Sequence, residues 1–108
     1  MIVIHLTYTG TNGSALAFVR QMEASGTADD IRREDGCLGY DYYVSVKDPE
    51  SVLLIDRWRD QAAIDAHHAS PMMARIAALR ERYDLHMQAE RLTDAGALPE
   101  NDRRYIRK

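Results

Sequence analysis

The sequence predicts a small α+β domain with the element order βαββαβ. Segments with apolar residues at every second position, as in strands, alternate with segments whose apolar residues recur every three or four positions, as in helices. Only the short turn 47–50 separates the two central strand segments, which predicts a β-hairpin. A length of 108 residues leaves room for one domain and a short tail.

The first strand is predicted over residues 2–9, where apolar and more polar residues occupy opposite phases. Ser14 can cap the helix that follows, in which apolar residues recur at spacings of three and four over 15–22. Gly26 interrupts this pattern before it resumes, so we expect a kinked or split helix. Gly36 then ends it.

The two strands of the hairpin are predicted over 37–46 and 52–58. The Asp-Pro pair in the intervening turn favours a tight reversal of the chain. In the first of these strands one phase is apolar, as is typical of a half-buried strand. That phase comprises Leu38, Tyr40, Tyr42, Val44 and Val46.

A second helical region is predicted to start at or near Asp60 and to reach the adjacent histidines 67 and 68. Ser70 can cap a further helical stretch that continues to about Tyr83. A last strand fits residues 84–92. Residues 1–93 are therefore predicted to form the domain, and residues 94–108 a polar extension that packs on a dimer partner.

Composition limits the classes of partner. The net charge is −3 and the charges are mixed along the chain, which disfavours nucleic acid as a partner. No apolar run approaches the roughly 20 residues that span a bilayer, and the N-terminus does not resemble a signal peptide. We therefore expect a cytoplasmic protein without a membrane partner.

A homodimer is expected because a domain of this size has a marginal core by itself. Cys37 is the only cysteine, so no internal disulfide can stabilise that core. Cys37 begins an apolar strand and is interpreted as a small buried residue rather than a nucleophile. No glycine-rich phosphate-binding motif is present, which gives nucleotide cofactors no support.

The adjacent histidines are candidates for chemistry. On a helix His67 and His68 point about 100° apart, and neither has a metal-ligating residue four positions away, so no metal site is expected. One of them could act as a base. The alternative interpretation is that one is solvated while the other packs at the helix end.

Asp56 and Trp58 share a strand phase, which places a carboxylate and an indole on one face of the sheet. Tyr40 and Tyr42 also share a face, and with Tyr8 they could form an aromatic wall for a flat ligand. The alternative interpretation is structural, since tryptophan commonly anchors cores and tyrosines are common in strands.

Two segments together resemble a known family. They are GluAspGlyCysLeuGlyTyrAsp at 34–41 and AspArgTrpArgAspGlnAlaAlaIleAspAlaHisHisAlaSerPro at 56–71. An acidic residue with Gly-Cys, an acid-x-Trp and an Ala-His before Ser-Pro, in this order, resemble the antibiotic biosynthesis monooxygenases, especially the small quinol monooxygenases. The resemblance extends over about residues 1–93.

The resemblance implies a ferredoxin-like βαββαβ sandwich that pairs with a second copy into a dimeric α+β barrel. It also implies oxidation of quinol or phenolic aromatic substrates by molecular oxygen, without flavin, haem or metal. His67 and Asp56 match the positions expected to be catalytic, with His67 as the base. The residues expected to bind substrate are Trp58, Tyr40, Tyr42 and His5.

Two departures narrow the implied activity. Met72 follows Ser-Pro where many members have a second histidine, so a mechanism with two histidines is not expected. Residues 75–79 carry no histidine, so haem degradation is not expected. Two other functions stay open on the sequence: a non-catalytic module that binds an aromatic metabolite, and an isomerase or decarboxylase on the same fold.

Overall fold

The computed structural model describes residues 1–108 and has the predicted order of elements, with each helical region divided in two. The elements are β1 (Ile2–Thr9), α1 (Ser14–Ala24), α2 (Thr27–Arg32), β2 (Cys37–Val44), β3 (Ser51–Trp58), α3 (Gln61–His68), α4 (Met72–Arg82), β4 (His86–Thr93) and α5 (Glu100–Arg103). The predicted α+β class, the βαββαβ order and the β2–β3 hairpin are confirmed.

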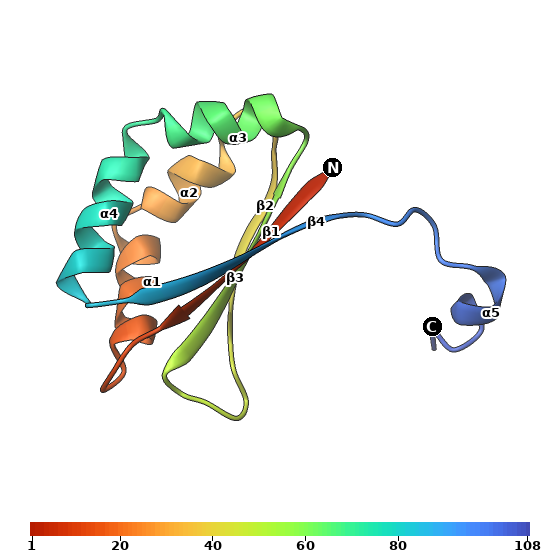
Figure 1. The fold of residues 1–108 in the computed structure, drawn as a ribbon, viewed down its shortest axis with the longest axis horizontal. Coiled ribbons are helices and arrows are strands. Elements are labelled where there is room, and N and C mark those ends of the chain that lie inside the picture. The colour runs from red at the N-terminus through yellow and green to blue at the C-terminus, as the bar shows by residue number, and fades with distance from the viewer.

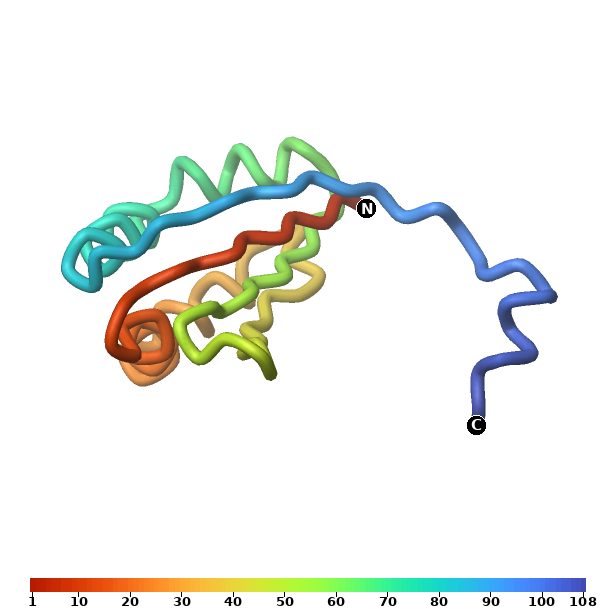
Figure 2. The backbone as a smooth tube through the Cα atoms, turned by 60° about the horizontal axis from the view of Figure 1, so that its bottom comes forward, coloured from red at the N-terminus to blue at the C-terminus, as the bar shows by residue number.

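The four strands form one antiparallel sheet in the order β2-β3-β1-β4. Helices α1 to α4 cover one face of this sheet, while the other face is left open (Figures 1 and 2). β1 and β3 are the central strands, and β2 and β4 are the edge strands. Each of the two helical connections, from β1 to β2 and from β3 to β4, therefore leads from a central strand to an edge strand of the same sheet. This is the ferredoxin-like arrangement.

Local sequence explains the start of α3 and the break between α1 and α2. The Asp60 side chain accepts a hydrogen bond from the backbone N–H of Ala63 at 2.9 Å and caps α3 as predicted. Gly26, with φ of 80°, separates α1 from α2 and confirms the predicted break.

The predicted serine caps are wrong. Gly13 occupies the N-cap of α1, and the Ser14 hydroxyl instead accepts a hydrogen bond from the backbone N–H of Thr11. Pro71 occupies the N-cap of α4, and the Ser70 hydroxyl is buried without a hydrogen-bond partner. Ser14 therefore lies one residue after the N-cap of α1, and Ser70 lies one residue before the N-cap of α4.

The core lies between the helices and the covered face of the sheet. Its largest fully buried side chains come from β1, β3, α1, α2 and α4. They include Tyr8, Phe18, Met22, Ile31, Leu54, Trp58 and Ile76. The rings of Tyr8 and Phe18 lie 5.0 Å apart between their centroids. Because every second residue of β3 faces this layer, Asp56 is drawn into the apolar interior with Leu54 and Trp58.

The predicted phase of β2 holds for Tyr40 and Tyr42 but is wrong for Leu38. A register shift between Cys37 and Gly39 leaves Leu38 as an extra residue, with 56% of its surface exposed. The strand also ends at Val44, so Val46 lies fully exposed at the hairpin turn.

The open face of the sheet and the tail are the most exposed parts of the chain. Every residue of β4 is exposed. Beyond Thr93 the tail leaves the body of the domain and carries α5 away from it (Figure 1). No helix has the length and apolar character needed to cross a membrane.

Candidate functional site

A cavity of about 330 Å³ lies between the sheet and helices α3 and α4. Its walls are mainly apolar and come from all four strands and both helices. The polar groups among its lining residues are Asp56, Gln61, His67, His68, Arg80 and Arg91. The volume is at the small end of the range of about 300–1,000 Å³ that is typical of small-molecule sites. A bicyclic or tricyclic aromatic compound is the size of ligand that it suits.

His67 is the most constrained polar group of this cavity. It is 6% exposed, and its ring stacks on the Trp58 indole with 4.8 Å between centroids and an interplanar angle of 30°. Its Nδ1 lies 2.7 Å from Oε2 of Glu34. A carboxylate accepts, so Nδ1 is the donor, and Nε2 is the ring nitrogen left with a lone pair in the neutral imidazole.

The loop between α2 and β2 places Glu34 against α3. The backbone N–H of Glu34 donates to Ile31, and its carbonyl accepts from Cys37, which forms a compact turn. Gly36 has φ of 84°, and a Cβ added there would lie 2.5 Å from the Cβ of Ala63. Glycine is therefore required for the loop to approach α3 closely enough for Glu34 to reach His67.

Asp56 is a buried carboxyl on the same face of β3 as Trp58. It is 6% exposed, and its Oδ1 has no hydrogen-bond partner. Burial raises the pKa of Asp56 above its ordinary value, and nearby Trp58 and His67 offset part of this effect. The cavity thus holds a carboxyl that retains a proton more readily than an exposed aspartate would.

Asp56 and Trp58 share one face of the sheet, as predicted, and the structure shows which face this is. Both side chains face the helices, in one cavity with His67 and Tyr40. Of the predicted site residues, these four are brought together.

Tyr40 and Tyr42 form an aromatic pair at one wall. Their hydroxyl oxygens lie 3.2 Å apart and their rings meet edge to face, 5.6 Å between centroids. Tyr40 lines the cavity. Tyr42 does not line it, and packs on Tyr40 and Phe18 instead. Burial raises the pKa of both phenols, so both remain protonated at neutral pH.

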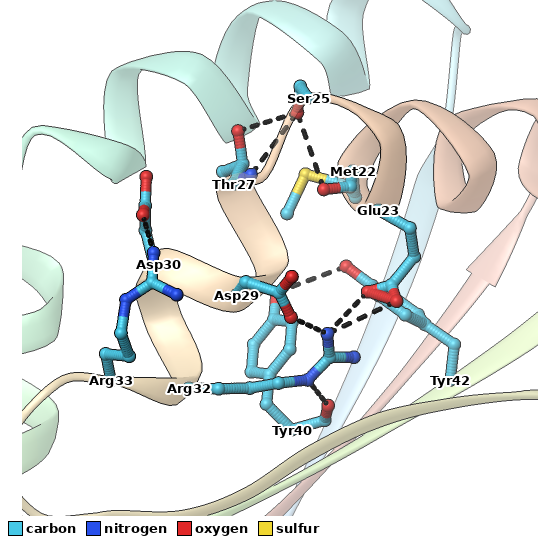
Figure 3. Close-up of polar contacts among 10 residues, drawn as sticks. All are labelled: Met22, Glu23, Ser25, Thr27, Asp29, Asp30, Arg32, Arg33, Tyr40 and Tyr42. Carbon is cyan, nitrogen blue, oxygen red and sulfur yellow. Dashed lines mark hydrogen bonds and ion pairs between the residues drawn. The ribbon is translucent and has the colours of Figure 1, made fainter.

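A network on the helical side fixes the position of Tyr40. Nε of Arg32 donates to the Tyr40 carbonyl at 2.9 Å, which ties α2 to β2 (Figure 3). The same guanidinium pairs with Glu23 of α1 at 2.7 Å and with Asp29 at 2.8 Å. Two helices and the edge strand are thereby held together at the cavity wall.

His5, predicted to bind substrate, lies away from this group. It is paired across the strands with Ile55 and Glu90, in the phase opposite to Ile4 and Asp56. Its side chain therefore faces the open side of the sheet and does not line the cavity. The second histidine of the pair, His68, does line the cavity but is largely exposed.

The polar residues of the site that were not predicted are Glu34, Gln61, Arg80 and Arg91. Glu34 had a signal in the sequence, because it belongs to the acidic Gly-Cys segment at 34–37. Arg80 and Arg91 had none, since α4 and β4 carry many charged residues and only the tertiary packing selects these two. No group of three or more His, Cys, Asp and Glu side chains lies close enough together to hold a metal ion.

A sequence profile of the antibiotic biosynthesis monooxygenase family matches residues 1–79. The chain belongs to this family. The matched part contains both segments that carried the resemblance, and every residue of the His67, Glu34, Asp56 and Trp58 group. No curated protein sequence matches the chain significantly.

Solved structures share the fold of this family member. A protein of Deinococcus radiodurans assigned to the same family has a TM-score of 0.78 and 23% identity, with 92% of this chain and 97% of that chain covered. PA3566 from Pseudomonas aeruginosa has a TM-score of 0.76 and 27% identity, covering 88% and 94%. A single-site mutant of SnoaB, a cofactor-independent oxygenase from Streptomyces nogalater, has a TM-score of 0.76 and 19% identity, covering 92% and 97%.

Proposed function

We propose that this family member is a cofactor-independent monooxygenase that oxidises quinol or phenolic aromatic substrates with molecular oxygen in the cavity beside His67. The observation that carries the proposal is the buried His67, whose Nδ1 is held 2.7 Å from Glu34 while its ring lines an apolar cavity. This is the arrangement expected of a general base with a fixed tautomer.

The first step is loss of the phenolic proton to Nε2 of His67. The imidazolium that forms is stabilised by the Glu34 carboxylate, in the way that a buried acid supports a catalytic histidine. Trp58, stacked on His67, prevents the ring from turning away. The substrate ring then lies against Trp58 and Tyr40 within the apolar walls.

The deprotonated ring is electron-rich and reduces oxygen itself. A C–O bond forms at a ring carbon that carries hydrogen, and the peroxide anion takes back the proton from His67. Loss of the ring hydrogen with cleavage of the O–O bond releases water and leaves a quinone. One oxygen atom enters the product and the other enters water, and because the substrate supplies the electrons this sequence requires no flavin, haem or metal.

Asp56 and Tyr40 are proposed to orient the second oxygen of the substrate. Burial raises the pKa of both groups, so Tyr40 donates a hydrogen bond to an oxygen that gains negative charge, and Asp56 does the same in its protonated form. Exclusion of water by the apolar walls strengthens these contacts and protects the anion from reprotonation.

Oxygen uptake tests the proposal. Chelator-treated, flavin-free protein is given naphthohydroquinols and anthrol-type phenols, and its rate is compared with that of buffer alone. His67→Ala is expected to reduce the rate to that of buffer, whereas His86→Ala, at an exposed position of β4, is expected to leave it unchanged. Tight binding of these rings without any uptake would instead favour a binding module.

The open face of the sheet supports a homodimer. Side chains of β3 and β1 on that face, including Leu53, Ile55 and Val3, are only half-buried in the single chain. A second copy packed on this face would cover them and produce the dimeric barrel. Residues 94–108 are proposed to pack on the partner, because Leu98, Tyr105 and Ile106 are each more than half exposed in the single chain.

A further inference from the structure

Two arginines of the cavity lack an acidic partner. Arg80 on α4 and Arg91 on β4 both line it, and neither forms an ion pair. The arginines that do form ion pairs lie elsewhere in the fold and comprise Arg32, Arg33, Arg59 and Arg75. Asp56 is the only acidic residue in the lining and forms an ion pair with neither arginine, so the two guanidinium groups outnumber the carboxyl groups of the cavity.

Arg80 is held in a fixed orientation. One terminal nitrogen donates to the Tyr8 hydroxyl at 2.8 Å, and the guanidinium lies 5.4 Å from the centroid of the Tyr8 ring. Its Nε is buried and has no hydrogen-bond partner. A buried N–H without an acceptor is costly, so this edge of the guanidinium is suited to an oxygen acceptor brought by a ligand.

Arg91 lies in a row of side chains that crosses the sheet. It is paired with Ile4, which is paired in turn with Asp56. With strands about 4.8 Å apart, Arg91 and Asp56 start about 10 Å from each other at their Cα atoms. No ion pair joins them, and Arg91 remains exposed at the edge strand, free to contact a ligand at the cavity.

The charged groups divide the cavity along its length. His67 and Trp58 lie at the end of β3, whereas Arg80 reaches in from the side of Tyr8, at the opposite end of β1. Arg91 starts level with Asp56, between these two ends, and its long side chain is proposed to extend toward Arg80. Between them, the cavity follows β3 from Trp58 to Leu54, four residues or about 14 Å of strand. A flat ring system with a hydroxyl at one end and an anionic group at the other matches this layout.

We propose that the cavity selects hydroxylated aromatic compounds that bear a carboxylate, which Arg80 and Arg91 bind while the hydroxyl faces His67. The planar guanidinium of Arg80 offers donors in the geometry that a carboxylate accepts. The substrate class rests on the proposed function, since it concerns the same cavity, but recognition of the carboxylate does not depend on turnover.

Calorimetric titration with a matched pair of probes tests this recognition. 2-Naphthoate and 2-naphthamide have nearly the same size and shape but differ in charge. We expect the naphthoate to bind about tenfold or more tightly than the amide at neutral pH. Equal affinities, or binding of neither probe, would overturn the proposal.

Variants assign the preference to the two arginines. Arg91→Gln changes an exposed residue and is expected to remove most of the preference for naphthoate while leaving the affinity for naphthamide unchanged. Arg80→Lys keeps the charge but loses the planar fork, and is expected to weaken naphthoate binding alone. Arg82→Gln, on the exposed side of the same helix, is the control. A preference that survives in both Arg91→Gln and Arg80→Lys would contradict the proposal.

Oxygen uptake separates failure of this proposal from failure of the proposed function. The two substrates are 1,4-dihydroxy-2-naphthoate and the uncharged 1,4-naphthohydroquinone. Equal uptake with both would overturn carboxylate selection but preserve the monooxygenase. Tight, carboxylate-dependent binding without uptake from either would support the selection and contradict the monooxygenase.

Discussion

Oε2 of Glu34 lies 2.7 Å from Nδ1 of His67, and the two residues are 33 positions apart in the chain. The side chain of each is largely buried, at 15% and 7% exposure. Since the contact fixes which ring nitrogen carries the proton, it determines whether His67 can act as a base toward the cavity. Glu34 is thus a positioning residue for the proposed reaction.

Glu34→Gln is expected to lower kcat for oxygen uptake by about 10- to 100-fold, because the amide can accept a hydrogen bond but cannot stabilise the imidazolium. KM is expected to change little, since Glu34 lies outside the cavity lining. Asp35→Asn, at the exposed neighbouring carboxylate, serves as the control. An equal loss in both variants would point to damage of the loop instead.

Gly36→Ala is expected to destabilise the fold and to reduce activity together. The added methyl group would meet Ala63 at 2.5 Å, at a position where φ is already positive. The expected loss is about 2 kcal/mol in the free energy of unfolding, measured by urea denaturation. Gly26→Ala has the same positive φ but no neighbour within 4 Å, so it carries the backbone strain without the clash and should retain more activity.

Asp56 is expected to make stability depend on pH. Its pKa is higher in the folded protein than in the unfolded chain, because burial disfavours the carboxylate. The folded state then binds the proton more tightly, so stability falls as pH rises from the ordinary aspartate value through the raised folded value, and is level above it.

Asp56→Asn removes this titration. At neutral pH the variant is expected to be about 1 kcal/mol more stable than the wild type toward urea, and the difference should shrink as pH falls below the folded pKa of Asp56. A variant that is less stable at neutral pH than the wild type would show that the ionised carboxylate is favoured in the fold.

The open sheet face predicts a change of assembly in Leu53→Glu. A charge at the centre of the proposed interface is expected to convert the homodimer into a monomer in sedimentation velocity runs. Val46→Glu, at the fully exposed hairpin turn, should leave the assembly unchanged. A wild-type chain that sediments as a monomer would contradict the dimeric barrel.

Several local features of the fold were predictable from the sequence, although the serine caps of α1 and α4 were not. The Asp60 cap and the break at Gly26 depend on residues within one helical turn, and the β2–β3 hairpin depends on a short turn. The bulge that exposes Leu38 was not predicted, because an extra residue in one strand is defined only by its partner strand.

The site was predictable only in part, for a similar reason. Asp56 and Trp58 share a face through the two-residue period of a strand, and this pattern is visible in the sequence. The contact of Glu34 with His67, and the convergence of Arg80 and Arg91, join elements that are distant in the chain. The sequence also does not show which face of β1 meets the helices, and His5, which was predicted to bind substrate, lies on the opposite face.

The most direct test of the central claim is an isotope experiment. Chelator-treated, flavin-free protein oxidises a phenolic substrate under ¹⁸O₂, and mass spectrometry counts the labelled atoms in the quinone. The proposed reaction predicts one ¹⁸O atom in each product molecule, formed by the wild type and lost in His67→Ala. Product that carries oxygen from water, or a yield no greater than in buffer, would contradict a monooxygenase at His67.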